Sequence, residues 1–189
     1  PAAPEVCDGL DNDCDSDVDE SSLRVPDQWP TIQAALDIAS DGDVVCVAPG
    51  TYFENIDYGG TSAHVLGWGG PDLTVIDGGG LDSVVRIDSG EGPGTILEGF
   101  TITNGVGTWG DGGGVQIENA EAELVDLMVT GNTGPRYGVG GIEVFYGSVD
   151  LLDVRVVGNT ASGIGGLLML SSQATGQWLS LIGNDGVLG

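Results

Sequence analysis

The amino-acid sequence predicts an all-β solenoid, and the main evidence is a short phrase that recurs at nearly constant intervals. The phrase is an apolar residue, a gap, a second apolar residue, a gap, and then Asp, Asn or Gly. Successive instances begin 27, 27, 27 and 25 residues apart: Leu73-Val75-Asp77, Phe100-Ile102-Asn104, Leu127-Val129-Gly131, Val154-Val156-Gly158 and Leu179-Leu181-Gly183. A fixed period with alternation inside it is typical of β-coils stacked on one another.

Alternation extends through the rest of each repeat. A Gly-Gly pair such as Gly113-Gly114 is followed by two alternating apolar positions, then by a second alternating pair, and then by the phrase. Three short strands per coil of about 25–27 residues are therefore predicted, with inward residues stacked in columns. The positions expected to face outward are acidic or polar: Gln116, Glu118, Glu123, Asp126, Glu143, Asp150 and Asp153.

Three regions are predicted along the chain: an acidic segment over residues 1–24, a cap over 25–43 and the solenoid over 44–189. Residues 30–40 switch to helical spacing, with Ile32, Ala35, Leu36 and Ala39 on one face. Thr31 suits the start of this helix and Gly42 its end. A short amphipathic helix here is expected to cover the apolar end of the first coil.

Charge narrows the classes of partner. The chain has 29 acidic residues, four arginines and no lysine, which gives a formal net charge of −25. Nucleic acid, anionic lipid and polyanionic substrates are disfavoured as partners, whereas counter-cations such as calcium are favoured. No apolar run reaches membrane-spanning length, and a chain that opens on Pro1 without a signal peptide is expected to be a processed protein.

The most distinctive motif lies between Cys7 and Glu20. Short carboxylates at alternating positions can converge on one hard cation, with a final acid adding bidentate coordination. The pattern differs from an EF-hand loop, because the sixth position counted from Asp11 is not Gly. A solvated acidic tail is the alternative to a Ca²⁺ site, whose expected ligands are Asp8, Asp11, Asp13, Asp15, Asp17, Asp19 and Glu20.

Cysteines and asparagines yield further expectations. Cys7 and Cys14 suit a local disulfide, with free thiols or metal ligands as the alternative. Cys46 lies 27 residues before Leu73 and is therefore expected to point inward as a buried, unpaired thiol. A polar column is expected at Asn104, Asn132, Asn159 and Asn184, either as a ligand-binding stripe or as stacked amides that bond from coil to coil.

Three stretches resemble known families. The pattern CDGxDNDCDxxxDE from Cys7 to Glu20 resembles a metal-binding motif of secreted and surface proteins of bacteria. Residues 29–35 and 42–55 are similar to the N-terminal cap and first coil of right-handed parallel β-helix proteins, the pectin-lyase-like superfamily. Residues 99–105 resemble the repeat phrase of its non-enzymatic surface members. These resemblances imply a right-handed parallel β-helix outside the cell.

The sequence also gives expectations about catalysis and sugar binding. No pair of aspartates on neighbouring coils stands beside an arginine, Arg86 and Asp88 suit a surface ion pair, and His64 suits a bystander, so no enzymatic activity is predicted. Trp109, in a Gly-rich loop, is the best candidate for stacking on a sugar in an adhesin module.

The C-terminal end of the repeat gives the functional hypothesis. No helix or polar cap follows the coil that ends at Asn184, which fits either an excerpt of a longer protein or an end that docks on another subunit. The prediction is an extracellular, calcium-binding structural subunit that assembles head-to-tail into a filament or surface layer. The first alternative is a monomeric adhesin that binds cell-surface glycans, and the last is a lyase or esterase that acts on an anionic polysaccharide.

Overall fold

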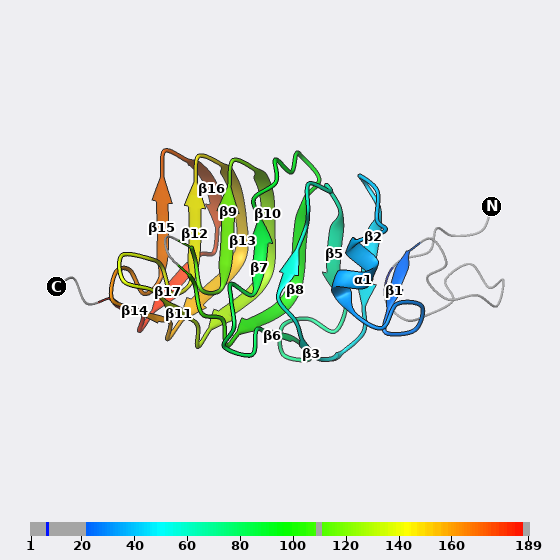
Figure 1. The fold of residues 1–189 in the computed structure, drawn as a ribbon, viewed down its shortest axis with the longest axis horizontal. Helices are drawn as coiled ribbons and strands as arrows, with labels where there is room; N and C mark the ends of the chain where they lie inside the picture. Colours follow the sequence, from blue (N-terminus) through cyan, green and yellow to red (C-terminus); the bar gives the residue numbers. More distant parts are fainter. Residues whose placement is uncertain (1–6, 8–21, 109–110, 187–189) are drawn as a thin grey trace.

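The chain forms a parallel β-solenoid of about five turns with almost no helix, which confirms the predicted fold class. The computed structural model describes residue 7 and residues 22–108 and 111–186. In Figure 1 the coils stack along the long axis, from the N-terminal coil on the right to the C-terminal coil on the left. Within the described residues, no helix is long and apolar enough to cross a membrane.

The N-terminal cap combines one strand and one short helix. β1 (Leu23–Val25) pairs in parallel with β2 (Val44–Val47), and α1 (Ile32–Leu36) is shorter than the predicted 30–40. Thr31 is the N-cap and its side chain accepts from the Ala34 amide, while the Glu54 carboxylate accepts from the amides of Ile32 and Gln33 at 2.9 and 3.0 Å. Both contacts satisfy amides that a helix start leaves unpaired.

The strands that follow form three parallel sheets, called sheets A, B and C. Sheet A contains β1, β2, β3 (Gly50–Phe53), β5 (His64–Gly67), β6 (Thr74–Asp77), β8 (Ile96–Thr103), β10 (Glu121–Thr130), β13 (Ser148–Val157), β16 (Gln173–Gln177) and β17 (Ser180–Ile182). Sheet B contains β4 (Ile56–Asp57), β7 (Val85–Ile87), β9 (Val115–Glu118), β12 (Ile142–Phe145) and β15 (Leu167–Leu170). Sheet C contains β11 (Thr133–Gly134), β14 (Thr160–Ala161) and β18 (Asp185–Gly186).

In the coils of β8, β10 and β13, the second and third expected strands are one continuous, bent strand, whereas β5 and β6, and β16 and β17, are separate. β10 and β13 each run for ten residues and bend at Asp126 and Asp153, where φ is 45° and 53°. Left-handed backbone at this corner turns the strand without ending it. A further two-residue strand, which the sequence pattern did not indicate, then starts sheet C.

Inward columns fill the core between the sheets. The apolar pairs at Leu127 and Val129 and at Val154 and Val156 are fully buried, as the alternation predicted. In parallel register each residue stacks on its equivalent, so that Leu124 pairs with Leu151. Burial of these columns supplies the main favourable free energy of folding.

The first instance of the repeated phrase is out of register by one residue. Val75 pairs with Thr101 and Ile76 with Ile102, so Thr74 and Ile76 are buried while Leu73 is 60% exposed. A slip of one residue moves a side chain to the other face of a sheet. The inward orientation predicted for Cys46 from Leu73 is also wrong, because Cys46 pairs with Leu66 of β5 and not with the strand that follows Leu73. Cys46 is buried as predicted, at 2% exposed, but it alternates with Val45 and Val47, which belong to the core.

Stacked amides connect the coils inside the turn before sheet C. The Asn159 side chain donates to Val129 O at 2.9 Å and accepts from the Asn132 amide at 2.9 Å, and Asn184 repeats the pattern on Asn159. Asn132 and Asn159 are at most 1% exposed. The structural interpretation of this column is confirmed for these three residues.

Asn104 does not belong to this column. It is exposed with φ of 57° and occupies the left-handed position of Gly131 and Gly158, whose φ values are 66° and 65°. Gly105 holds the register of Asn132 and donates its amide to the Asn132 side chain at 2.8 Å. The column position predicted for Asn104 therefore belongs to Gly105, one residue later.

Candidate metal centre and the acidic faces of the solenoid

The N-terminal acidic segment is attached to the solenoid by a disulfide between Cys7 and Cys46. Their Cα atoms are 5.7 Å apart and their sequence separation is 39 residues. The predicted Cys7–Cys14 pairing and the predicted free thiol at Cys46 are both wrong. Because Cys46 lies on the outer face of β2, it can reach a partner outside the core.

The predicted metal ligands lie outside the described residues. These are Asp8, Asp11, Asp13, Asp15, Asp17, Asp19 and Glu20, and Cys14 lies among them. In the part of the chain that the structure describes, no group of three or more His, Cys, Asp or Glu side chains could hold a metal ion. The candidate ligands therefore remain those of the N-terminal segment, beside the anchored Cys7.

Trp109 also lies outside the described residues, so its proposed contact with a sugar has no structural description. Among the described tryptophans, Trp178 is 75% exposed and Trp68 is 38% exposed. Trp178 occupies the bend position of Asp126 and Asp153 in the last coil, with φ of 58°.

An arginine joins three aspartates on the outer face of sheet B. Arg86 on β7 lies 2.6 Å from Asp82, 3.2 Å from Asp111 and 3.6 Å from Asp88. Burial alone would lower the pKa of Arg86, but its bonds to Asp82 and Asp111 outweigh burial and raise that pKa. The expected Arg86–Asp88 pair is the longest contact of this network. Because Asp111 belongs to the next coil, the network also corrects the expectation that no aspartates of neighbouring coils stand beside an arginine.

Two residues expected to face solvent are buried on the outer face of sheet B. Gln116 on β9 is 2% exposed and Glu143 on β12 is 6% exposed, and the two are register partners. The Gly112 amide donates to Gln116 Oε1 at 2.6 Å, whereas Glu143 Oε2 is buried with no partner among the described residues. Burial, followed by the carboxylates of Asp111 and Glu118, raises the pKa of Glu143 to about 7.

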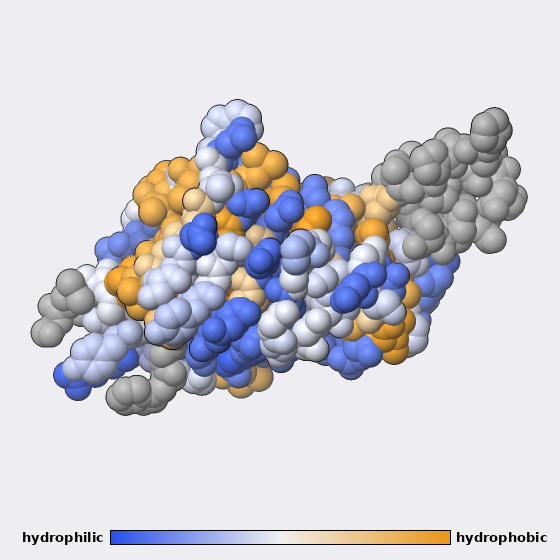
Figure 2. All heavy atoms as spheres, turned by 90° about the horizontal axis from the view of Figure 1, so that it is seen from above, coloured by the Kyte–Doolittle hydropathy of each residue, from blue (hydrophilic) through white to orange (hydrophobic). Residues whose placement is uncertain are grey.

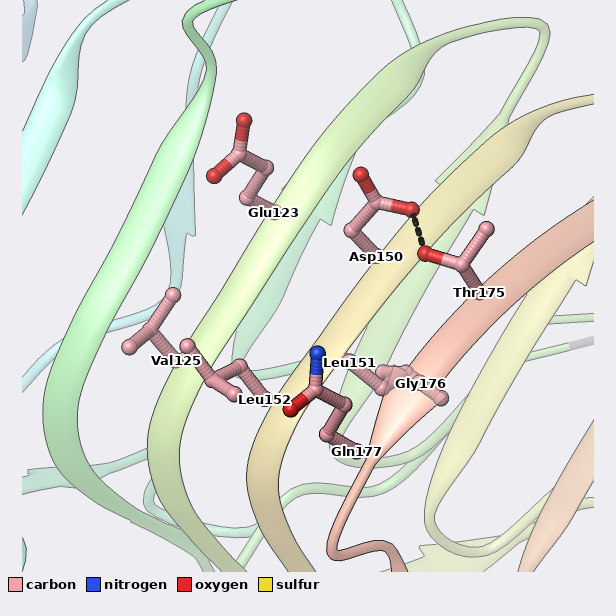
Figure 3. A pocket seen from close by; sticks show the side chains of 8 residues that line it. All are labelled: Glu123, Val125, Asp150, Leu151, Leu152, Thr175, Gly176 and Gln177. Atoms are coloured by element: carbon pink, nitrogen blue, oxygen red, sulfur yellow. Dashed lines mark hydrogen bonds between the residues drawn. The ribbon is translucent and has the colours of Figure 1, made fainter.

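Sheet A carries a shallow groove of about 290 Å³ on its outer face. Figure 3 shows the carboxylates of Glu123 and Asp150 on one side, with Thr175 donating to Asp150. Val125, Leu152 and Gln177 lie on the other side of the groove. Glu123 and Asp150 are direct register partners, and like charges placed opposite one another repel, so this groove favours a cationic group over an anionic one.

Further ion pairs flank the bend of sheet A. His64 Nε2 lies 2.9 Å from Glu98 Oε2, and Arg155 lies 3.8 Å from Asp126. Burial, followed by the neighbouring Asp153, raises the pKa of Asp126, and Arg155 partly opposes this. His64, expected to be a bystander, thus holds a carboxylate of the adjoining coil.

Comparison with known proteins bears on the N-terminal segment alone. Residues 1–20 match the family model Cu-binding MopE, which is described as a "Putative metal-binding motif". No curated protein and no solved structure matches the chain. The fold and this match together define a parallel β-solenoid with a metal-binding motif at its N-terminal end.

Sequence reasoning missed the burial of Gln116 and Glu143 for one shared reason. Glu143 and Gln116 alternate as surface residues should, but the segment before β9 crosses over them. The Gly-rich stretch 110–114 was the available signal, since glycines permit close approach of one backbone to another. The Cys7–Cys46 pairing carried no local signal, because the cysteines are separated by the whole cap.

Proposed function

We propose that the chain is an extracellular structural protein of the pectin-lyase-like β-helix type, in which the N-terminal segment binds calcium. The observation that carries the proposal is the metal-binding motif over residues 1–20, joined covalently to the first coil through Cys7–Cys46. Disulfides persist in oxidising compartments, which supports a location outside the cell. The proposal assigns no catalysis to the chain.

Calcium is favoured over copper by the chemistry of the segment. Its candidate donors are six aspartates and Glu20, and hard oxygen donors suit calcium. Copper prefers imidazole and sulfur donors. The sequence contains a single histidine, His64, and its Nε2 already contacts Glu98.

Calorimetric titration of the full chain with Ca²⁺ and, separately, with Cu²⁺ tests this assignment. The expected result is a Ca²⁺ isotherm that Asp13→Asn with Asp15→Asn abolishes. The matched control is Asp150→Asn, which removes an exposed carboxylate from the sheet A groove and should leave the isotherm unchanged. Tight Cu²⁺ binding without Ca²⁺ binding would reassign the metal.

We also propose head-to-tail assembly through the ends of the solenoid. In the last described coil the column residues Leu179 and Leu181 are 39% and 51% exposed, although their equivalents Val154 and Val156 are buried. Figure 2 shows hydrophobic side chains breaking the hydrophilic surface over the C-terminal coils. At the other end of sheet A, β1 pairs with β2 on one side only among the described strands, so a parallel sheet could continue from copy to copy.

Negative-stain imaging with calcium and then with excess chelator tests assembly. Filaments that shorten on chelation and disappear in Leu181→Lys are expected. Leu81→Lys, at a position 78% exposed on the side of the solenoid, is the control and should still form filaments. Single compact particles under both conditions would contradict the assembly.

A monomeric glycan-binding module is the second candidate, and an exposed aromatic residue favours it. Tyr146 is 57% exposed beside Phe145, with ring centroids 4.2 Å apart, and borders a groove with Asn119, Ser148 and Gln173. An aromatic face beside polar groups suits a sugar ring. Glycan-array binding that Tyr146→Ala abolishes, and that the exposed control Tyr137→Ala retains, would support this function over the filament.

A further inference from the structure

Glu143 occupies an unusual position for a residue on the outer face of a solenoid. It lies in the middle of β12, between Gln116 of β9 and Leu168 of β15. Nevertheless it is 6% exposed, and its Oε2 atom has no hydrogen-bond partner among the described residues. A buried carboxylate without a partner is costly when ionised, and protonation removes that cost.

The cover over Glu143 is the backbone of residues 111–114, here called the strap. A Cβ atom on Gly112 would lie 3.0 Å from the Glu143 amide nitrogen and 3.1 Å from its Cβ, so the strap passes directly over this residue. The strap is held by the Gly112 amide, which donates to Gln116 Oε1, and by a bridge between Gly112 and Val139. The strap thus lies against a residue whose Oε2 atom is shielded from water, and loosening the strap would open that oxygen to water.

The charged groups around Glu143 oppose its ionisation. Asp111 on the strap and Glu118 on β9 both act on it as like charges. Arg86 on β7 is the nearby cation, but it already bonds Asp82 and Asp111 and contacts Asp88. Thr108 also donates to Asp111 at 2.6 Å, which fixes the negative charge of the strap near Arg86.

We infer that Glu143 is a proton-operated latch: the strap lies closed over β9 and β12 while the carboxyl is protonated, and loosens when it ionises. The ionised form needs hydrogen-bond donors that the closed site does not supply, and water is the available source. Repulsion from Asp111 acts in the same direction. A midpoint near neutral pH follows from the raised pKa of about 7.

Hydrogen exchange of the Gly112 amide, measured by NMR on the full chain from about pH 5 to about pH 9, tests the latch. After correction for the intrinsic exchange rate, protection of this amide should fall by at least about tenfold between the two ends of the pH range. A shift of one pKa unit corresponds to about a tenfold change in the equilibrium constant for opening. The Ile142 amide, which donates to Gly166 O at 2.9 Å, is the internal reference and should stay protected. The Glu143 carboxyl carbon should titrate with the same midpoint.

Two variants separate the latch from general unfolding. Glu143→Gln keeps the shape without the charge, so the Gly112 amide should remain protected at every pH. Glu118→Gln removes a like charge and should lower the midpoint of the native latch. A Glu143 midpoint in the ordinary range of glutamate, or unchanged pH dependence in Glu143→Gln, would overturn the inference.

Calcium distinguishes a proton from a metal ion as the occupant. The titration is repeated with millimolar Ca²⁺, and the midpoint of Glu143 should not change. If Ca²⁺ restored Gly112 protection at alkaline pH in the native chain but not in Glu143→Gln, the site would bind a cation and the latch would be wrong.

Discussion

Several residues adopt an unusual backbone conformation at the corner where the strands of sheet A bend. Asp126, Asp153 and Trp178 hold left-handed φ values of 45°, 53° and 58° at one corner, where Gly99 holds 79° in an earlier coil. Non-glycine residues are uncommon in this region of backbone space. The corner therefore tolerates side chains that project into solvent and accumulate charge along the stack.

The free energy of unfolding should depend on pH through Glu143. Its folded pKa of about 7 exceeds the ordinary value of 4.5, so the unfolded chain releases the proton first as the pH rises. Stability is fully present below pH 4.5, falls as the pH rises to about 7, and is then constant, with a loss of at most about 3 kcal/mol. Urea unfolding of Glu143→Gln should match the native chain near pH 4 and exceed it at pH 8.

Glu123→Gln provides the control for this pH dependence. Glu123 is exposed on β10, the strand that follows β9 in the chain. Its substitution should leave the difference between acidic and alkaline stability unchanged. An equal gain in both variants would assign the effect to net charge rather than to Glu143.

The disulfide determines how the N-terminal acidic segment is attached to the solenoid. Peptide mapping of the non-reduced protein identifies which cysteines are paired. The expected linked peptide contains Cys7 and Cys46. Cys46→Ser should lower the free energy of unfolding by about 2–4 kcal/mol, because it releases a long loop. Cys14→Ser is the control and should retain the linked peptide, whereas a Cys7–Cys14 peptide would contradict the structure.

At the scale of elements, the coils are joined by both strand pairing and the asparagine ladder. Asn159 links β10 and the coil of β13 to the final coil, since its side chain reaches Val129 O, the Asn132 amide and Asn184 Oδ1. Such a ladder fixes the turn before sheet C in equal register from coil to coil. It also satisfies polar groups that water cannot reach.

Replacing this link should be costly. Asn159→Ala leaves the buried Val129 carbonyl and Asn132 amide without their partner, and each unsatisfied group costs about 1–3 kcal/mol. Thermal or urea unfolding should therefore show a clear loss of stability. Gln177→Ala, exposed on β16, is the matched control, and equal losses in the two variants would show that the ladder contributes little.

The whole molecule is dominated by negative charge. With a formal net charge of −25 spread over a thin solenoid, repulsion between coils opposes folding, and salt screens that repulsion. The free energy of unfolding should thus rise with NaCl concentration. Calcium at the same ionic strength should add a further gain if the N-terminal segment binds it. Equal effects of the two salts in thermal melts would contradict a specific site.

Sequence reasoning reached the repeat but not every register. Leu127, Val129, Val154 and Val156 followed directly from the period, because parallel stacking places equivalent residues in one column. Leu73 did not, since the first instance of the phrase is displaced by one residue. Cys46 did not, since it pairs with Leu66 and not with the strand that follows Leu73. The match over residues 1–20 agrees with the metal-binding motif seen in the carboxylate spacing, and the identity of the ion stays a prediction.

By itself, the sequence determined the stacked-coil architecture, the capping helix and the acidic N-terminal motif, because periodicity and local spacing carry these features. Only the tertiary structure decided that Cys7 pairs with Cys46 and that Glu143 is buried beneath Gly112. The disulfide joins residues 39 positions apart in the sequence, and the segment over Glu143 crosses the adjoining coil. The path of such a segment is set by packing between distant residues, and no local pattern encodes it.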